Sequence, residues 1–163
     1  MCAILDSILP KIEYYFMYTN QFGFRKNSNT SDAIIEFPDY VYSSLDSEQR
    51  NIAVYLDFSK AFETVNHNIL MSKLRHHGVR GVMQSWFESY LSNRKQYVSI
   101  KNCRSSMSNI TLGVPKGSVL GGVFFLLYIN DMYRSSNQMR FVHLADDTTV
   151  LHPTVTLTMY MPL

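Results

Sequence analysis

The sequence predicts an α+β fold. Short apolar runs that are typical of strands are mixed with amphipathic stretches that are typical of helices, and they follow no regular βαβ repeat. With 46% hydrophobic, 13% aromatic and 17% charged residues, the composition is that of an ordinary globular chain, which excludes a disordered or fibrous protein. A length of 163 residues is enough for one domain with a hydrophobic core.

The first elements are a helix and a strand. After a loop rich in Asn and Ser, Ser31 is placed to cap a helix that begins at Asp32 and that Pro38 interrupts or ends. The apolar run at residues 52–56 predicts a short buried strand. Asp57 follows at once, so a carboxylate is expected at the tip of this strand.

Two helices and a strand come next. Asn66 is expected to cap a helix that runs through His77 and that Gly78 closes. Residues 79–91 have the apolar spacing of a second helix, and residues 96–101 alternate in the manner of a strand.

In the last third of the chain, residues 113–117 predict a Gly- and Pro-rich loop, and residues 118–132 predict an apolar helix. Two strands are predicted at residues 139–144 and 148–151. Ala145, Asp146 and Asp147 form the turn between the two strands, where aspartate is a favoured residue type.

The formal net charge of +2 is unevenly distributed. Residues 1–63 hold five Lys or Arg and nine Asp or Glu, whereas residues 64–163 hold ten and four. The stretch between Ser89 and Asn130 has no acidic residue and five basic ones: Arg94, Lys95, Lys101, Arg104 and Lys116. Such a stretch suits a polyanion, because neutralised phosphates supply most nucleic-acid affinity. On charge alone, a solvated basic face is the preferred interpretation.

The two cysteines, Cys2 and Cys103, allow one bridge at most, so we expect an intracellular, reducing compartment, either nucleus or cytoplasm. The longest apolar stretch, residues 119–129, is too short to span a membrane. The N-terminus lacks the basic segment and long apolar core of a signal peptide. We therefore expect no membrane partner and no secretion.

Five segments of the chain resemble, in the same order, segments of the reverse transcriptases of non-LTR retrotransposons. The three segments that resemble motifs A, B and C are LDFSKAFETVNH (residues 56–67), GVPKGSVLG (113–121) and LADDTT (144–149). QFGFRK (21–26) resembles the segment ahead of the palm, and YLSNRKQYV (90–98) the link between motifs A and B. A chance match of all five in order is very improbable, because each would have to fall at its own place in the chain.

The resemblance implies a polymerase palm, which is an antiparallel sheet with helices packed on one face, with part of the fingers and without the thumb. Residues 1–50 would then be a partial fingers region, residues 51–153 the palm with its three motifs, and residues 154–163 an unmatched tail. A truncated chain of this kind is expected to have little or no polymerase activity by itself, because such catalysis depends on positioning the primer, template and nucleotide.

The resemblance also implies an activity: template-directed transfer of dNMP from a dNTP to the 3′-hydroxyl of a DNA primer on an RNA template. Asp57 and Asp146 would be the principal ligands of two Mg²⁺ ions, with Mn²⁺ as an alternative ion. Asp147 and the backbone carbonyl of Phe58 would support them. The chemistry agrees, because hard oxygen ligands suit Mg²⁺ and two divalent ions can hold the attacking and leaving oxygens of phosphoryl transfer.

The same resemblance assigns the substrate contacts. Phe62 would lie under the incoming sugar and leave no room for a 2′-hydroxyl, although a phenylalanine at such a position is by itself more typical of a core. Lys116 and Gly117 would contact the nucleotide. The residues expected to contact nucleic acid are Arg94, Lys95, Lys101, Gly113 and Pro115.

Three positions depart from the pattern: Glu63 stands where the family usually has Asp, Lys116 where it has Gln, and Leu144 where it has Tyr or Phe. Because of these departures, a catalytically decayed remnant that binds nucleic acid or is purely structural is the alternative function. A third hypothesis is the palm of an RNA-dependent RNA polymerase. Phe62 argues against it, since such an enzyme must admit the 2′-hydroxyl.

Overall fold

A computed structural model describes residues 17–154. The chain divides into two compact units, and their described parts are residues 60–129, here called the helical unit, and residues 17–59 with 130–154, here called the sheet unit. The expected tail after residue 154 lies outside the described residues, as does the beginning of the expected fingers region. The domain boundaries expected at residues 50 and 153 remain predictions.

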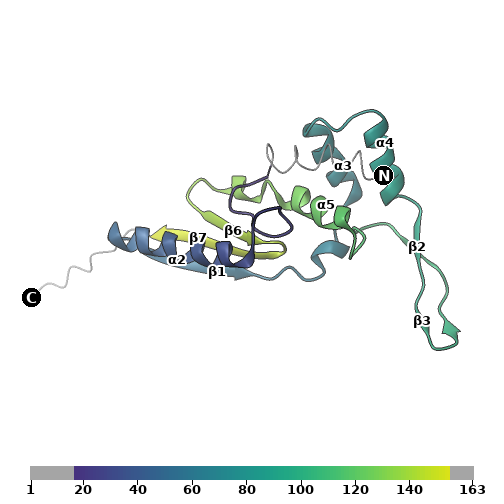
Figure 1. Ribbon diagram of the computed structural model, residues 1–163, viewed down its shortest axis with the longest axis horizontal. Helices are drawn as coiled ribbons and strands as arrows, with labels where there is room; N and C mark the ends of the chain where they lie inside the picture. Colours follow the sequence, from purple (N-terminus) through teal and green to yellow (C-terminus); the bar gives the residue numbers. More distant parts are fainter. Residues whose placement is uncertain (1–16, 155–163) are drawn as a thin grey trace, which may run out of the picture. The chain divides into compact units, whose positions relative to one another are not determined.

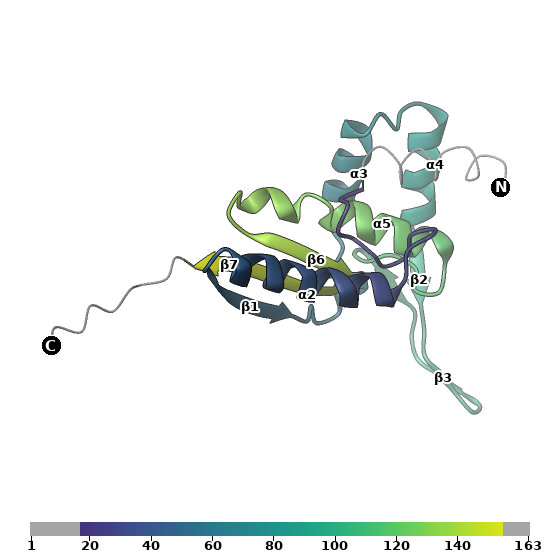
Figure 2. The same ribbon diagram turned by 60° about the vertical axis from the view of Figure 1, so that its left-hand side comes forward.

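The described part of the sheet unit contains helix α2 (Thr30–Asp46), strands β1 (Arg50–Leu56), β6 (Arg140–Leu144) and β7 (Asp147–Thr154), and the 3-10 helix η2 (Met132–Ser135). The strands are antiparallel in the order β1-β7-β6, so strands far apart in the sequence pair with each other. Helix α2 lies along one face of this sheet (Figures 1 and 2), and Ala33, Val142 and Leu151 form the core between them. The antiparallel sheet with a helix on one face confirms the predicted fold class.

Helix α2 begins earlier than the sequence predicted. Asn29 caps it: its side-chain oxygen accepts from the Asp32 amide at 3.1 Å, and the Asp32 carboxylate accepts from the Asn29 amide at 2.9 Å. This reciprocal pair satisfies two amides that a cap at Ser31 would leave open, so the expectation for Ser31 was wrong. Pro38 lies inside the helix and does not end it. That expectation was also wrong, because packing on the sheet outweighs the one lost backbone hydrogen bond.

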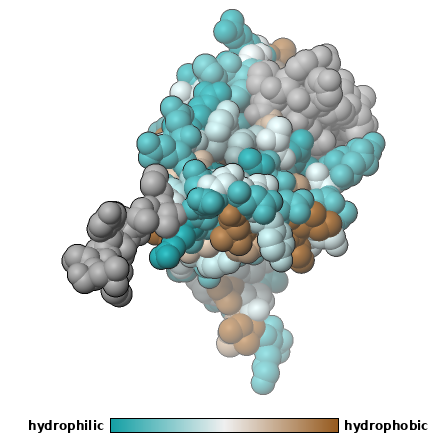
Figure 3. Space-filling model, turned by 90° about the vertical axis from the view of Figure 1, so that its left-hand side faces the viewer, coloured by the Kyte–Doolittle hydropathy of each residue, from teal (hydrophilic) through white to brown (hydrophobic). Residues whose placement is uncertain are grey.

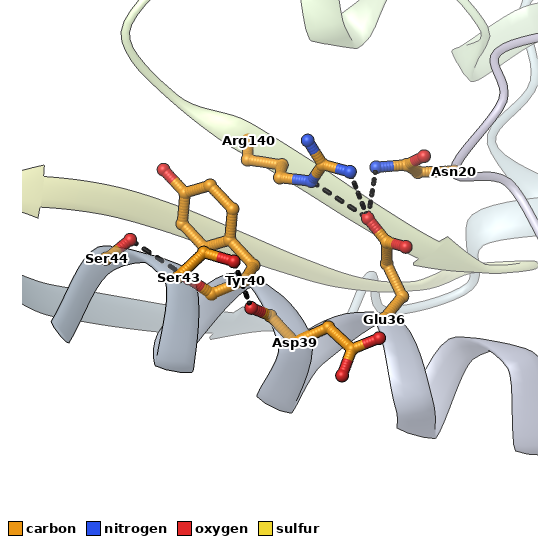
Figure 4. A network of polar contacts seen from close by, with 7 residues as sticks. All are labelled: Asn20, Glu36, Asp39, Tyr40, Ser43, Ser44 and Arg140. Carbon is orange, nitrogen blue, oxygen red and sulfur yellow. Dashed lines mark hydrogen bonds and ion pairs between the residues drawn. The ribbon is translucent and has the colours of Figure 1, made fainter. Parts of the chain in front are cut away.

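A polar network ties α2 to β6 and to the segment before the helix (Figure 4). The Glu36 carboxylate accepts from Arg140 Nε at 2.9 Å, from Arg140 Nη2, and from Asn20 Nδ2 at 3.1 Å. The Arg140 guanidinium also lies 5.3 Å from the centre of the Tyr40 ring. Since the Glu36 and Arg140 side chains are partly exposed, we expect their ion pair to fix the helix position more than to add stability.

Strand β1 is not the buried strand that its apolar sequence predicted. Among the strands of the described chain it pairs with β7 alone, and the side chains of Ile52, Val54 and Tyr55 are exposed. An apolar run indicates a strand but not how many neighbours cover it. The face drawn in Figure 3 likewise has apolar patches scattered among polar residues. Within residues 17–154, no helix combines the length and the apolar character needed to cross a membrane.

The helical unit contains η1 (Ala61–Glu63), α3 (His67–His76), α4 (Val82–Leu91), β2 (Arg94–Gln96), β3 (Ser99–Ile100), β4 (Cys103–Arg104), β5 (Ser108–Ile110) and α5 (Val119–Ile129). Helix α3 contacts both α4 and α5. The expected cap at Asn66 is confirmed, because its side-chain oxygen accepts from two backbone amides of the first turn, at 2.9 and 3.2 Å. Gly78 follows the helix with a φ of +85°, as a C-terminal glycine should.

Residues 94–110 form a two-stranded ribbon, here called the ribbon arm, that leads away from α4 in both views (Figures 1 and 2). Strand β2 pairs with β5, and β3 with β4 at the tip. The strand predicted at residues 96–101 is therefore two short strands separated by a break. The apolar helix is also shorter than predicted, since α5 ends at Ile129.

Candidate active site

The two adjacent aspartates lie at a tight hairpin turn between β6 and β7. Leu144 pairs with Asp147, which leaves Ala145 and Asp146 as a two-residue turn. Ala145 has a φ of +60°, whereas Asp146 is not among the residues with positive φ, so the turn is of type II′. A residue other than glycine in this conformation stores strain of about 1–3 kcal/mol. The Asp146 side chain is half-buried and that of Asp147 is exposed.

The sheet brings Asp57 to the same turn. Strand β1 pairs with β7 in a register that places Leu56 opposite Thr148. Continuing this register by one residue places Asp57 opposite Asp147, and neighbouring strands lie about 4.8 Å apart. Phe58 follows directly. The backbone positions of acidic residues from two distant segments are thus neighbours at one end of the sheet.

These residues fit a hard divalent cation by donor type and by backbone position, since carboxylate and carbonyl oxygens are the ligands that Mg²⁺ prefers. Their side chains are not gathered around a common point. Among residues 17–154, no three His, Cys, Asp or Glu side chains are close enough to hold a metal ion. Three ionised carboxylates at close range would repel one another, and a bound cation would relieve this repulsion.

His143 lies opposite Thr148 in the hairpin, on the face of the sheet that points away from α2. Its side chain is 2% exposed, its ring stacks on Phe141 with centroids 5.9 Å apart, and its Nδ1 lies 2.8 Å from the Thr148 hydroxyl. Burial lowers the pKa of His143 from 6.5 to about 4. The imidazole is therefore neutral at pH 7, and His143 is a core residue.

Leu144, which stands where the family has an aromatic ring, packs as a partly buried member of the core around Ala33, Val142 and Leu151. Next to it is a pocket of about 330 Å³ that Leu144, Asp147 and residues of α2 and β1 line. The Leu144 side chain thus packs against the core of the sheet and also lines a pocket beside the acidic turn.

In the helical unit, the loop at residues 113–117 is anchored at its first residue. The Gly113 amide donates to Val65 O at 2.8 Å, while its carbonyl accepts from Arg94 Nη1 at 3.2 Å and contacts His67 Nε2 at 2.8 Å. Gly113 has a φ of +84°, and an added Cβ would lie 2.7 Å from the backbone oxygen of Glu63. Only glycine fits here, because both the conformation and the space exclude a side chain.

Glu63 and Lys116, two of the departures from the family pattern, contact each other. Lys116 Nζ lies 2.7 Å from Glu63 Oε1, and both side chains are more than half exposed. The hydrogen bond and the positive charge of Lys116 lower the pKa of Glu63. The same two residues line, together with Arg94, Gly113 and others, a polar pocket of about 490 Å³.

Phe62 is half-buried and stacks on Phe125, with ring centroids 4.3 Å apart and an angle of 29° between the planes. The ring is therefore held by a buried partner on α5. This arrangement agrees with a fixed steric gate and also with a plain packing role.

The expected site residues fall into two groups. Asp57, Phe58, Asp146 and Asp147 lie in the sheet unit, and all the expected nucleotide and nucleic-acid contacts lie in the helical unit. Within the second group, the polar pocket is lined by Arg94, Gly113 and Lys116. Pro115 and Gly117 complete the loop, and Lys95 and Lys101 are exposed on the ribbon arm.

Sequence reasoning missed two residues that hold these segments. His67 supports the loop through Gly113, and Gln21 contacts the acidic turn at the Ala145 amide, at 3.1 Å. Both lie inside segments that carry the family resemblance, at residues 56–67 and 21–26. That position is the only signal that could have drawn attention to them.

Three comparisons bear on the family. A model of the family described as "Reverse transcriptase (RNA-dependent DNA polymerase)" matches residues 2–157. The "RNA-directed DNA polymerase from mobile element jockey" of Drosophila melanogaster is 28% identical over 157 residues. The "Probable RNA-directed DNA polymerase from transposon X-element" of the same organism is 31% identical over 113 residues.

The match to the jockey polymerase covers 92% of this chain and 16% of that polymerase. The match to the X-element polymerase covers 69% of this chain and 12% of that polymerase. The chain therefore spans less than a fifth of these curated relatives. Among solved structures, the "Partial Cas6-RT-Cas1–Cas2 complex" is similar with a TM-score of 0.46 and 20% identity, over 92% of this chain and 25% of that one.

Proposed function

The chain belongs to the reverse transcriptase (RNA-dependent DNA polymerase) family, and we propose that it forms the catalytic palm of a mobile-element polymerase that adds dNMP to a primer on an RNA template. The family match and the Drosophila relatives confirm the resemblance to non-LTR reverse transcriptases. The family generally uses divalent metal ions. The observation that carries the proposal is the β1–β7 register, which brings the carboxylates of motifs A and C to one end of one sheet.

Asp57 and Asp146 are the proposed principal metal ligands, with Asp147 and the Phe58 carbonyl in support. Two divalent ions, Mg²⁺ or Mn²⁺, would supply the positive charge that phosphoryl transfer between polyanions requires. The residues of the chain would fix where this charge is held: the hairpin turn sets the directions of the Asp146 and Asp147 carboxylates, and the end of β1 sets the position of Asp57.

The helical unit supplies the proposed substrate contacts. The stacking of Phe62 on Phe125 supports a rigid ring that would exclude a 2′-hydroxyl. Lys116 and Gly117 are proposed to contact the nucleotide. The proposed nucleic-acid contacts are Arg94, Lys95, Lys101, Gly113 and Pro115.

The comparisons do not favour the alternative of a decayed remnant. The three altered residues are compatible with the fold, since Glu63 and Lys116 pair with each other and Leu144 packs against the core. The relatives are named RNA-directed DNA polymerases, which likewise does not favour an RNA-dependent RNA polymerase.

The test is Mn²⁺ binding to the full chain, with and without dNTP. Binding is measured as the loss of the electron paramagnetic resonance signal of free Mn²⁺. We expect saturable binding that dNTP strengthens and that Asp146→Asn weakens at least about tenfold. Asp39→Asn is the matched control, since Asp39 is exposed on α2 and the substitution removes the same charge.

Equal Mn²⁺ affinity in the wild type, Asp146→Asn and Asp39→Asn would contradict the proposed metal site. The substrate is tested by competition between dNTP and rNTP for the Mn²⁺-loaded chain. Preference for dNTP that Phe62→Ala abolishes supports the DNA polymerase, whereas equal binding of rNTP to the wild type opposes it.

A further inference from the structure

The acidic turn is held from outside its own hairpin. Strand β6 pairs with β7 on one side, and on its other edge a short segment runs parallel to it, with Gln21 bridged to His143. The Phe22 amide donates to His143 O at 2.8 Å, and the His143 amide donates to Asn20 O at 2.9 Å. The residue between these two bonds, Gln21, is therefore fixed beside β6 just before the turn.

The side chain of Gln21 reaches the turn itself. It is 3% exposed, and its Oε1 accepts from the Ala145 amide at 3.1 Å and from the Gly23 amide at 2.9 Å. One carbonyl oxygen can accept two such bonds. The amide of the strained turn residue is thus paired with a side chain 124 positions earlier in the chain.

The segment that carries Gln21 is stiffened by its own contacts. Arg25 Nη1 donates to the carbonyl oxygens of Tyr18 at 3.0 Å and of Gln21 at 3.1 Å. At Gly23 the backbone approaches the turn so closely that an added Cβ would lie 2.2 Å from the Ala145 nitrogen. Contact on this side of the turn is therefore made by backbone and by one amide oxygen.

We propose that Gln21 is a positioning residue for the acidic turn: its side-chain oxygen holds Ala145 in its positive-φ conformation and so sets the directions of Asp146 and Asp147. Without this acceptor, the partly buried Ala145 amide loses its side-chain partner, and the strained turn is free to relax. The consequence for metal binding rests on the proposed function, whereas the effect on the turn does not.

Three variants of the full chain test this role. Gln21→Met removes the acceptor at similar side-chain length, and Gln21→Glu retains an oxygen that can accept both bonds. Leu151→Ala is the stability control, because Leu151 is fully buried in the same hairpin and pairs with Arg140, away from the turn.

The first measurement is amide hydrogen exchange, monitored by NMR in the absence of added metal. In Gln21→Met we expect exchange at Ala145 and Gly23 to accelerate about ten- to hundredfold relative to the central β6–β7 amides. Gln21→Glu should restore slow exchange. Leu151→Ala should accelerate the hairpin amides together, without selecting the turn.

The second measurement is the Mn²⁺ dissociation constant, which we expect to rise about tenfold in Gln21→Met and to remain near or below the wild-type value in Gln21→Glu. Leu151→Ala, measured where it is folded, should bind as the wild type does. Unchanged exchange at Ala145 in Gln21→Met, or equal effects in Gln21→Met and Leu151→Ala, would overturn the positioning role.

The two proposals fail separately. If Mn²⁺ binding does not depend on Asp146, the proposed metal site is wrong, and the exchange data still decide whether Gln21 fixes the turn. If Asp146 is required but Gln21→Met binds Mn²⁺ as tightly as the wild type, the metal site stands and the positioning role of Gln21 is wrong.

Discussion

The acidic turn of the sheet unit and the 113–117 loop of the helical unit are held in different ways. The hairpin that carries the turn has partners on both edges: β1 pairs with β7, and Gln21 and Gly23 contact Ala145 at the β6 edge. The loop is fixed at Gly113, while Lys116 and Gly117 at its far end are exposed. Rigid support would suit the proposed metal ligands, and an exposed loop that carries Lys116 would suit the proposed contact with the nucleotide.

The largest expected effect compares two glycines. Gly23→Ala would place a Cβ 2.2 Å from the Ala145 nitrogen, so we expect a loss of about 3 kcal/mol in the free energy of unfolding. Gly117→Ala is the matched change in the loop. Gly117 has a φ of +75° but nothing within 4 Å of an added Cβ, so only conformational strain of about 1 kcal/mol is expected. Urea denaturation measures the free energy of unfolding of both variants. Similar losses in the two would show that the backbone around the turn adjusts to an added Cβ as readily as the loop does.

The second prediction uses pH. The pKa of His143 is lowered to about 4 by burial, whereas the unfolded chain has the ordinary value of 6.5. Between these two values the unfolded state binds more protons than the folded state, so stability is full above pH 6.5 and falls as the pH decreases to 4. The loss should be at most about 3 kcal/mol.

Carboxylates titrate in part of the same range, so the measurement is the difference between the wild type and His143→Gln in urea denaturation at several pH values. Gln retains a partner for the Thr148 hydroxyl and cannot take up the proton. A steeper decrease for the wild type between pH 6.5 and 4 is expected, and parallel curves would show that His143 is protonated equally in the folded and unfolded states.

The third prediction concerns strain at the turn. Ala145→Gly should raise the free energy of unfolding by about 1 kcal/mol, because glycine adopts a φ of +60° without strain. Ala53→Gly in β1 is the control, and it should lower stability by about 0.5–1 kcal/mol, since β1 is extended and glycine is more flexible when unfolded. Thermal denaturation checks the opposite signs. Loss of stability in both variants would mean that the turn conformation carries little strain.

The smallest expected effect lies in the loop. Lys116→Gln restores the residue type usual in the family, and because the Glu63–Lys116 pair is exposed, we expect no measurable change in stability. The pKa of Glu63 should rise toward its ordinary value, because the hydrogen bond and positive charge of Lys116 are what lower it. A carboxyl titration by NMR measures this, with Lys101→Gln on the ribbon arm as the control. A Glu63 pKa that stays low in Lys116→Gln would assign the effect to another group.

The sequence by itself determined the fold class, most of the elements and the family. The cap at Asn66, the loop at residues 113–117 and the turn between the last two strands follow from local residue preferences, which act over a few positions. The motif segments carried the identity of the family without any structure. Local signals gave a wrong prediction at two positions of α2. Asn29, and not Ser31, is the N-cap, because it forms a reciprocal pair with Asp32. Pro38 lies within the helix, because packing on the sheet outweighs its local preference.

Only the tertiary structure decided how the distant parts meet. The exposure of β1, the approach of Asp57 to Asp147 and the contact of Gln21 with Ala145 depend on strand order and register. The register between β1 and β7 joins strands that are far apart in the sequence, so no local preference along the chain encodes it. The carboxylates are therefore recognisable in the sequence, while the side chain that fixes their turn became visible only when residues 124 positions apart were placed side by side.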